Sequence, residues 1–301
     1  MLSITGLSHT YPNGVQALKD INLEIPKGMF GLLGPNGAGK SSLMRTIATL
    51  QQPNQGALRF GDVDILAEPE RLRRMLGYLP QDFGVYPRIS AADMLDQLAV
   101  LKGITDKKER KRVVGQLLEQ TNLAHARKKA LSTFSGGMRQ RFGIAQALLG
   151  DPQLIIVDEP TAGLDPEERN RFHNLLSEIG ENVVVILSTH IVEDVADLCP
   201  AMAIIAEGRI VAEGAPAELM ARLEGRIWRK VIDKTDLEDH RARHTVIATR
   251  LSAGRTLIHV LADSHPGDGF EPVTPDMEDV YFATLAQVRG GSRGAGDAIA
   301  A

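Results

Sequence analysis

Residues 34–41 read GPNGAGKS and match the pattern G-x-x-x-x-G-K-[S/T]. The apolar run MFGLLG leads into this stretch and reads as a buried strand, and KSSLMRTIATL follows as an amphipathic helix. Glycines at positions 34, 37 and 39 allow backbone angles and close approaches that a Cβ would block. The free N–H groups of such a loop, with the N-terminus of the helix, surround a phosphate group. The strand before the loop and the helix after it disfavour a plain Gly/Ser turn and predict a phosphate-binding loop, or P-loop.

Two side chains of the P-loop carry the expected chemistry. Lys40 would reach the β- and γ-phosphate oxygens of a nucleotide, and the hydroxyl of Ser41 would ligate Mg²⁺. The other contacts would come mainly from the backbone. The predicted nucleotide-binding residues of this stretch are Gly34, Pro35, Asn36, Gly37, Ala38, Gly39, Lys40, Ser41 and Ser42.

A second stretch, QLIIVDEPTAGLD, places two carboxylates at the end of an apolar strand. Asp158 would hold the Mg²⁺ shell, and Glu159 would orient or polarise the water that attacks a phosphate. Successive strand residues face opposite ways, so both carboxylates can meet one nucleotide only if the strand ends there. Pro160 follows directly and is consistent with such an end. Without the P-loop the pair would read as an acidic turn; with it, the pair predicts a catalytic edge of the sheet.

The composition limits the number of domains, the kinds of partner and the cellular compartment that fit this chain. The chain has 301 residues, of which 43% are hydrophobic and 24% charged, enough for one large or two modest soluble domains. The formal net charge of -4 gives no overall basic field for nucleic acid or anionic lipid. The single cysteine, Cys199, excludes a disulfide framework and favours a reducing cytoplasm. The N-terminal MLSITGLSHTYPNG lacks the layout of a secretion signal, and no apolar stretch approaches the roughly 18 residues of a membrane span.

Strand-like and helical stretches alternate through the first two thirds of the chain. They predict an α/β fold with a mainly parallel sheet and helices on its faces. The N-terminal piece instead suggests short antiparallel strands joined at the turn PNG, and AEGRIVAEG suggests a hairpin. After GAPAELMARLEG, a turn and a short helix, the stretches RIWRKVI, HTVIATRL and TLIHVLA read as a small strand-rich unit. PDMEDVYFATLAQV reads as a last helix, and the Gly/Ala/Ser-rich end reads as a disordered tail.

Six motifs occur in one order along the chain: GPNGAGKSS, YLPQD, FSGGMRQR, LIIVDEP, AGLD and LSTH. In this order and approximate spacing they resemble the nucleotide-binding subunits of ATP-binding cassette (ABC) transporters. The resemblance covers about residues 1–220 and implies a P-loop NTPase domain with an N-terminal antiparallel subdomain and a helical subdomain at about 82–150. The rest would form a small C-terminal accessory or dimerisation domain of α+β type over 221–289 and a disordered tail over 290–301.

The motif FSGGMRQR at 134–141 places a second glycine-rich turn at a helix start, where it could simply be a helix cap. The resemblance implies instead that two subunits pair head to tail, and that this signature turn of one closes over the ATP held by the other's P-loop. Ser135, Gly136 and Gly137 would then contact the γ-phosphate across the dimer, and Asp165 of AGLD would act near the same site. Each ATP would hold the dimer shut until hydrolysis removes the γ-phosphate contact.

Three further roles follow from the resemblance alone. Tyr11 sits where the family stacks an aromatic ring on adenine, and Gln81 where a glutamine touches Mg²⁺ or water and senses the γ-phosphate. His190 ends VVVILSTH, where the family has a switch histidine that contacts the γ-phosphate and orients the water. The competing readings are a core or turn tyrosine, a plain loop glutamine and a structural histidine.

Two positions depart from the pattern commonest in the family. Phe134 stands where Leu is commoner and should change only packing, and Ser42 stands where Thr is frequent and keeps a hydroxyl. Neither departure implies a dead site. The chain is therefore expected to be an active ATPase that uses ATP and Mg²⁺, with the implied catalytic set Lys40, Gln81, Glu159 and His190.

A single cassette followed by a small C-terminal unit resembles the ATPases of bacterial exporters whose permease is a separate polypeptide. The implied partners are a second cassette subunit, in a homodimer or paired cassette, and a transmembrane permease. The permease would hold this cytoplasmic chain at the inner face of the cell membrane. Residues 82–104 would carry the permease-docking surface or, alternatively, only the core of the helical subdomain. The transported substrate is not visible in the sequence.

Two other classes compete with this reading. A soluble cassette ATPase acting on nucleic acid or the ribosome would carry two cassettes or a coiled-coil insertion, and the chain has neither. The stretch 222–259 holds nine Lys/Arg against five Asp/Glu, a mild excess that is typical of a solvated face. A P-loop kinase or GTPase would not need SGGM or LSTH, and the guanine-reading Asn-Lys-x-Asp of GTPases is absent.

Overall fold

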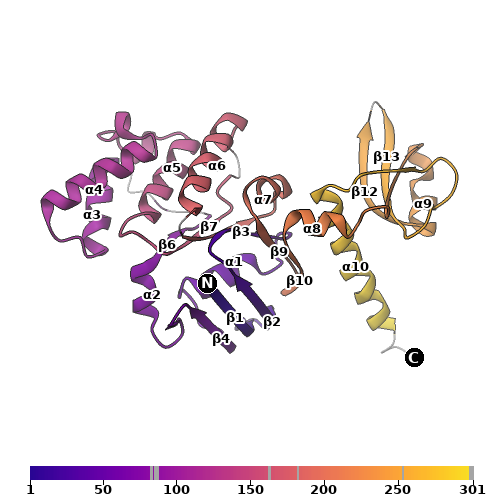
Figure 1. The fold of residues 1–301 in the computed structure, drawn as a ribbon, viewed down its shortest axis with the longest axis horizontal. Helices are drawn as coiled ribbons and strands as arrows, with labels where there is room; N and C mark the ends of the chain where they lie inside the picture. The colour runs from indigo at the N-terminus through magenta and orange to yellow at the C-terminus, as the bar shows by residue number, and fades with distance from the viewer. Residues whose placement is uncertain (82–83, 85–87, 162–163, 182, 253, 298–301) are drawn as a thin grey trace.

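The described residues form three sheets with their helices, two packed together and the third apart from them (Figure 1). The computed structural model describes residues 1–81, 84, 88–161, 164–181, 183–252 and 254–297. The first two sheets and the helices α1 to α7 form one body, and the third sheet lies at the opposite end, with α8 and α10 between them (Figure 1). No helix among the described residues is both long enough and apolar enough to span a bilayer.

The central sheet has six strands in the order β10-β9-β3-β8-β7-β6. All neighbours pair in parallel except β9 and β10, which form the antiparallel hairpin expected from AEGRIVAEG. The inner strands are buried on both faces, which explains their unbroken apolar runs. The strands are β3 (Gly28–Leu33), β6 (Leu76–Leu79), β7 (Leu154–Asp158), β8 (Val184–Thr189), β9 (Ala201–Ala206) and β10 (Arg209–Gly214).

A second, antiparallel sheet of order β2-β1-β4-β5 packs beside the first. The hairpin of the first two strands at the turn PNG is confirmed, whereas the two later strands, which pair around the short turn Gly61–Asp62, were not predicted. Its strands are β1 (Leu2–Thr10), β2 (Gln16–Ile25), β4 (Gln55–Phe60) and β5 (Val63–Asp64), and the helices α1 (Lys40–Ile47) and α2 (Pro69–Met75) complete this part.

The helical subdomain has a core of its own. Ser90 caps the first helix and Asp106 the second, each by accepting a hydrogen bond from a backbone N–H of the first turn. Phe134 is buried there with its ring edge-on to Phe142, so its departure from Leu is absorbed by packing. The subdomain contains α3 (Ala91–Leu101), α4 (Lys107–Gln120) and α5 (Gly136–Ala147), and α6 (Pro166–Gly180) and α7 (Val192–Leu198) follow along the central sheet.

The C-terminal unit is a four-stranded sheet of order β12-β13-β11-β14. The three strands expected from RIWRKVI, HTVIATRL and TLIHVLA are confirmed; α9 was not predicted, because its charged sequence has no apolar period. The elements are α8 (Pro216–Ala221), β11 (Ile227–Ile232), α9 (Leu237–Arg243), β12 (Thr245–Ser252), β13 (Arg255–Leu261), β14 (Glu271–Pro272) and α10 (Met277–Asp297).

The last helix packs against both parts of the molecule. It contacts β12 in the C-terminal unit, α8 between the two parts, and α7, β9 and β10 in the cassette body. The helix continues to Asp297, so the disordered tail expected from residue 290 differs from the structure over 290–297. Extending an existing helix costs less than starting one, which offsets the glycines of this stretch. Residues 298–301 of the expected tail lie outside the described residues.

Candidate functional site

The P-loop opens into a cavity of about 730 Å³ at the carboxyl edge of the central sheet. Ligands of open α/β sheets bind at this edge. We call it the P-loop cavity. It is lined by Tyr11, Val15, Gln16, Ala17, Lys19, Asn36, Gly37, Gly39, Lys40, Ser41, Ser42, Gln81, Glu159, Glu207 and Gly208.

Glycine is required at two positions of the loop for different reasons. Gly39 has a φ of 112°, and a Cβ there would lie 2.6 Å from the carbonyl oxygen of Ala17. A Cβ at Gly34 would lie 2.3 Å from the carbonyl oxygen of Ile205. Side chains at either position would push the loop away from the neighbouring strands and close the cradle.

Lys40 is buried at the floor of the cavity and is held by the loop that it belongs to. Its Nζ donates to the carbonyl oxygens of Gly34 (2.6 Å) and Pro35 (3.2 Å) and lies 3.5 Å from Oε1 of Glu159. Burial lowers the pKa of Lys40, and the charge of Glu159 opposes this shift. The ammonium is therefore poorly solvated, and additional negative oxygens would stabilise it.

Glu159 meets the same nucleotide edge as Asp158 because β7 ends between them. The strand ends at Asp158, and Glu159 has a φ of 49°, a left-handed conformation that is unfavourable for a residue with a Cβ. Oε2 of Glu159 lies 2.9 Å from Nδ1 of His190, at the end of β8. The expectation that the strand stops at these carboxylates is confirmed, and His190 contacts Glu159.

Asp158 has the properties of a ligand for a hard cation. It is buried, and its Oδ1 has no hydrogen-bond partner among the described residues. Burial raises the pKa of Asp158, and the hydroxyls of Ser188 and Ser41 oppose the shift. Mg²⁺ prefers one or two carboxylate or hydroxyl oxygens together with phosphates and water. An unpartnered carboxylate oxygen beside the Ser41 hydroxyl fits this ion, and no cluster of three or more His, Cys, Asp or Glu ligands competes for it in the described part of the chain.

Tyr11 and Ser42 lie together at one wall of the cavity. The Tyr11 hydroxyl is 3.0 Å from Oγ of Ser42 and donates to Oε1 of Gln51 at 3.2 Å. The His9 ring packs edge-on against the Tyr11 ring. Tyr11 is thus only partly buried and is oriented by these contacts. Gln81 lines the cavity and is exposed, and residues 82, 83 and 85–87, which follow it, lie outside the described residues.

The signature turn is not part of its own subunit's P-loop cavity. Ser135 caps α5 by accepting from the N–H of Met138 at 3.2 Å, and Ser135 and Gly136 are exposed. Gly137 is buried, and a Cβ there would overlap the carboxylate of Glu168. Asp165 caps α6 by accepting from the N–H of Glu168 at 2.9 Å. The turn and this helix start form helix caps within the subunit and leave Ser135 and Gly136 accessible from outside.

Sequence reasoning missed the turn between β9 and β10 as part of the site. Glu207 and Gly208 line the cavity, and the N–H of Gly208 donates to the carbonyl of Ala38 in the P-loop at 2.9 Å. The N–H of Lys19 donates to the carbonyl of Gly208 at 2.8 Å. Glu207 and Gly208 both have a positive φ, and the glycine of this pair is the local sign of a turn. Nothing in the sequence places this turn beside the P-loop.

Curated relatives are similar to the chain well beyond the motifs. The sequence profile of the family described as "ABC transporter" matches residues 18–162. The daunorubicin/doxorubicin resistance ATP-binding protein DrrA of Streptomyces peucetius is 33% identical over 267 residues, covering 88% of this chain and 78% of the relative. The methionine import ATP-binding protein MetN of Bordetella pertussis is 33% identical over 277 residues, covering 89% of this chain and 75% of the relative.

A solved structure shares the fold. The ATP-binding cassette MJ0796, in a dimeric post-hydrolysis state bound to ADP and Pi, matches with a TM-score of 0.66 and 25% identity, over 71% of this chain and 98% of that one. The structural match thus leaves out part of this chain, whereas the DrrA match covers most of it. Motifs, cavity geometry, fold and relatives agree, and the chain belongs to the family of ABC transporter ATP-binding proteins.

Proposed function

We propose that two copies of the chain bind two ATP molecules between them and that hydrolysis drives a separate transmembrane permease. The observation that carries this proposal is that Lys40 and Glu159 line one cavity beside the P-loop and that Glu159 also contacts His190. Within this cavity the phosphates of ATP would replace the two loop carbonyls as partners of Lys40. Because its ammonium is poorly solvated, this exchange favours binding.

Glu159 and His190 would act on the attacking water. The Glu159 carboxylate accepts from the His190 ring, which fixes one of its oxygens and leaves the other beside Lys40. Phosphoryl transfer depends mainly on positioning and on stabilising charge, so a carboxylate held at the cavity floor is suited to orient water. Asp158, Ser41 and Gln81 would hold Mg²⁺, which neutralises charge on the phosphates when bound.

The second copy supplies what the P-loop cavity lacks. Residues 135–137 lie outside the cavity and present a serine hydroxyl and N–H groups at a helix start. In a head-to-tail homodimer these groups would close over the partner's ATP, and Asp165 would lie near the same interface. The dimeric MJ0796 cassette supports this arrangement as a precedent.

A groove of about 450 Å³ between α2, α3 and α5 is our candidate for the permease contact. Its lining includes Leu50, Tyr78, Leu98, Leu101 and Lys102, and the side chains of Leu50 and Leu101 are exposed. Part of the segment expected to dock the permease, 91–102, contributes to it; residues 82, 83 and 85–87 lie outside the described residues. The groove would hold the chain at the inner face of the membrane.

We propose export as the direction of transport. The support is the match to DrrA, a resistance protein, over 88% of the chain. The methionine import protein MetN matches over a similar share of the chain, so identifying the permease is the test of the direction.

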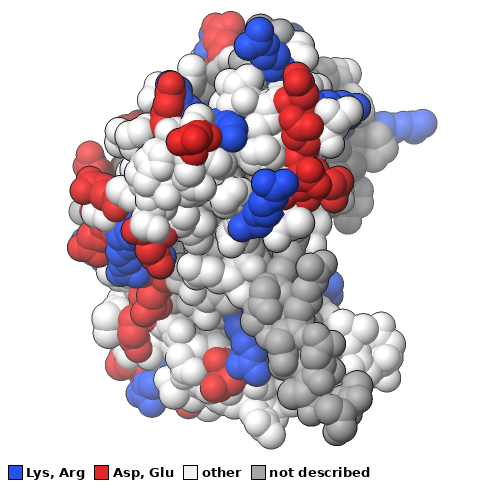
Figure 2. Space-filling model, turned by 90° about the vertical axis from the view of Figure 1, so that its right-hand side faces the viewer, with Lys and Arg blue, Asp and Glu red and all other residues white. Residues whose placement is uncertain are grey.

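The nucleic-acid alternative receives no support from the surface. Figure 2 views the end of the molecule that carries the C-terminal unit and shows Lys and Arg interspersed with Asp and Glu. Pairs such as Arg229 with Glu271 and Arg226 with Asp263 neutralise much of the local charge. A nucleic-acid site needs a basic patch or stripe, and the described residues of this face form none.

The experiment that tests the proposal replaces Glu159 by Gln. We expect Glu159→Gln to bind ATP, to hydrolyse it about 100-fold or more slowly, and to accumulate as a dimer on a sizing column with ATP and Mg²⁺. Glu167→Gln is the matched control, since Glu167 is exposed and pairs only with Arg171 at the surface. If Glu159→Gln stayed monomeric at saturating ATP and Mg²⁺, the shared-site proposal would be wrong.

A further inference from the structure

A buried carboxylate lies behind the catalytic pair and was not identified from any motif. Asp194, in the first turn of α7, is fully buried. Its Oδ1 accepts from Nε of Arg169 at 2.7 Å and lies 2.9 Å from Nε2 of His173. Its Oδ2 accepts from the hydroxyls of Thr161 at 2.5 Å and Thr189 at 3.5 Å. One carboxylate therefore contacts four side chains from three segments.

These segments carry the groups that act on ATP. Thr161 lies two residues after Glu159, in the loop that leaves β7. Thr189 ends β8 directly before His190, and its Oγ1 also accepts from the N–H of Ile191 at 3.0 Å. By bonding both threonines, Asp194 ties the loop of Glu159 to the loop of His190. Arg169 and His173 add α6, the helix that Asp165 caps.

The arrangement keeps the carboxylate charged. Burial acts to raise the pKa of Asp194, but the hydrogen bonds from His173, Thr161 and Arg169 outweigh it and hold the pKa below its usual range. A buried ionised carboxylate is costly unless its partners stay in place. Displacing either loop would therefore leave the buried charge less well paired, which opposes such a movement.

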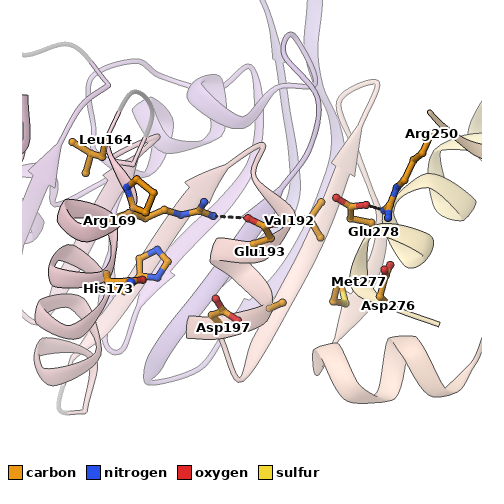
Figure 3. Close-up of a pocket in the computed structure, with 13 residues that line it drawn as sticks. Leu164, Arg169, His173, Val192, Glu193, Asp197, Arg250, Asp276, Met277 and Glu278 are labelled. Carbon is orange, nitrogen blue, oxygen red and sulfur yellow. Dashed lines mark hydrogen bonds and ion pairs between the residues drawn. The ribbon is translucent and has the colours of Figure 1, made fainter. Parts of the chain in front are cut away.

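One side of the network faces a cavity of about 540 Å³ between the cassette body and the C-terminal unit (Figure 3). Arg169 extends toward Glu193 across this wall, with Nη2 3.2 Å from Oε2, and His173 lies beside it (Figure 3). Arg250 and Glu278 pair on the opposite wall (Figure 3). The guanidinium of Arg169 thus bridges the exposed Glu193 and the buried Asp194.

We propose that Asp194 is a positioning residue for ATP hydrolysis, which holds Glu159 and His190 at their working separation by bonding Thr161 and Thr189. This inference rests on the proposed ATPase function. Asp194 does not touch the nucleotide, so it acts on the rate of the chemical step and not on the affinity for ATP.

The test compares two buried aspartates. Asp194→Asn keeps the shape but loses the charge, and we expect kcat for ATP hydrolysis to fall about tenfold or more, with KM and the affinity for a fluorescent ATP analogue within about twofold. Asp194→Glu, which restores the charge, should recover part of kcat. The control is Asp279→Asn: Asp279 is equally buried and bonds His259 at 2.7 Å in the C-terminal unit, and its loss should leave kcat unchanged.

Thr161→Val serves if Asp194→Asn does not fold, because it removes one hydroxyl from the network with little change in volume. It should also lower kcat at unchanged KM. The inference is overturned if these variants keep the wild-type kcat, or if they lower it no more than Asp279→Asn at equal loss of melting temperature. A wild-type chain without any ATPase activity would instead overturn the proposed function.

Discussion

Three residues at or directly beside the P-loop cavity are held in states that an isolated chain would avoid. Glu159 adopts a left-handed φ, Lys40 is a buried ammonium, and Asp158 has a buried oxygen without a partner. Each costs folding free energy, on the order of 1–3 kcal/mol for a strained or unpaired group. Lys40 and Glu159 line the cavity and Asp158 directly precedes Glu159, so this cost is concentrated where phosphate and a cation would relieve it. The site is therefore preorganised for a ligand at the expense of the ligand-free state.

Gly136 tests the role of the signature turn at the scale of one residue. A Cβ at this position would meet no heavy atom within 4 Å, so Gly136→Asp should leave the fold and melting temperature unchanged. A carboxylate there would face the γ-phosphate of the partner's ATP, and we expect turnover to fall about 100-fold or more. Nucleotide binding through Lys40 should persist. Steady-state ATPase assays and titration with a fluorescent ATP analogue measure the two effects separately.

Gly136→Asn is the matched control, because it adds nearly the same volume without the charge. We expect it to retain far more activity than the aspartate variant. Equal turnover of Gly136→Asp and the wild type would show that the turn does not approach a phosphate.

At the scale of elements, α7 packs closely on β3 of the central sheet. A Cβ at Gly31 of β3 would be 2.5 Å from Cγ1 of Val195 and 3.3 Å from Sγ of Cys199. Gly31→Ala should therefore push α7 from the sheet and lower the free energy of unfolding by about 1–3 kcal/mol. Gly115→Ala in α4 is the control, since its Cβ would meet nothing within 4 Å.

Cys199 reports this displacement. Burial raises the pKa of Cys199 to about 12, so the native thiol stays protonated and should react slowly with a thiol reagent near pH 8. The thiol ionises more readily in the unfolded chain, so its contribution to stability is lost as pH rises above its ordinary pKa. We expect faster modification of Cys199 in Gly31→Ala than in the wild type or Gly115→Ala. Equal rates in all three would show that β3 tolerates the methyl group without moving α7.

The elements that the sequence predicts well are those with a strong local signal. Continuous apolar runs predicted β3, β7 and β8, and the glycine loop predicted where α1 begins. The contacts of Asp194 could not be predicted in this way, because Thr161, Arg169 and Asp194 are brought together only by the order of strands in the sheet. The same holds for Gly208 against the P-loop. Local patterns identify residues that act, whereas the residues that position them depend on tertiary packing.

At the scale of the whole molecule, α10 joins the C-terminal unit to the cassette body. Met277, Val280 and Ala283 are buried in the same apolar cluster as Val195 of α7 and Ile204 of β9. The sequence predicts a separate unit over 221–289, but a shared core favours joint unfolding, because detaching the unit would expose apolar surface on both sides. We therefore expect one cooperative transition for the chain.

Trp228 makes this expectation measurable. It is the chain's one tryptophan and lies in β11, where its indole N–H donates to the carbonyl of Ala262 at 3.1 Å. Its fluorescence thus reports on the C-terminal unit, while far-ultraviolet circular dichroism reports on all helices and strands. The urea unfolding curves measured by fluorescence and by circular dichroism should coincide for the wild type. Val280→Asp buries a charge in the shared cluster and should shift both curves to lower urea together, whereas Phe282→Ala, at an exposed position of α10, should shift them little. A fluorescence curve that moved alone would show that the C-terminal unit unfolds by itself, and α10 would then be a tether and not a shared element of the core.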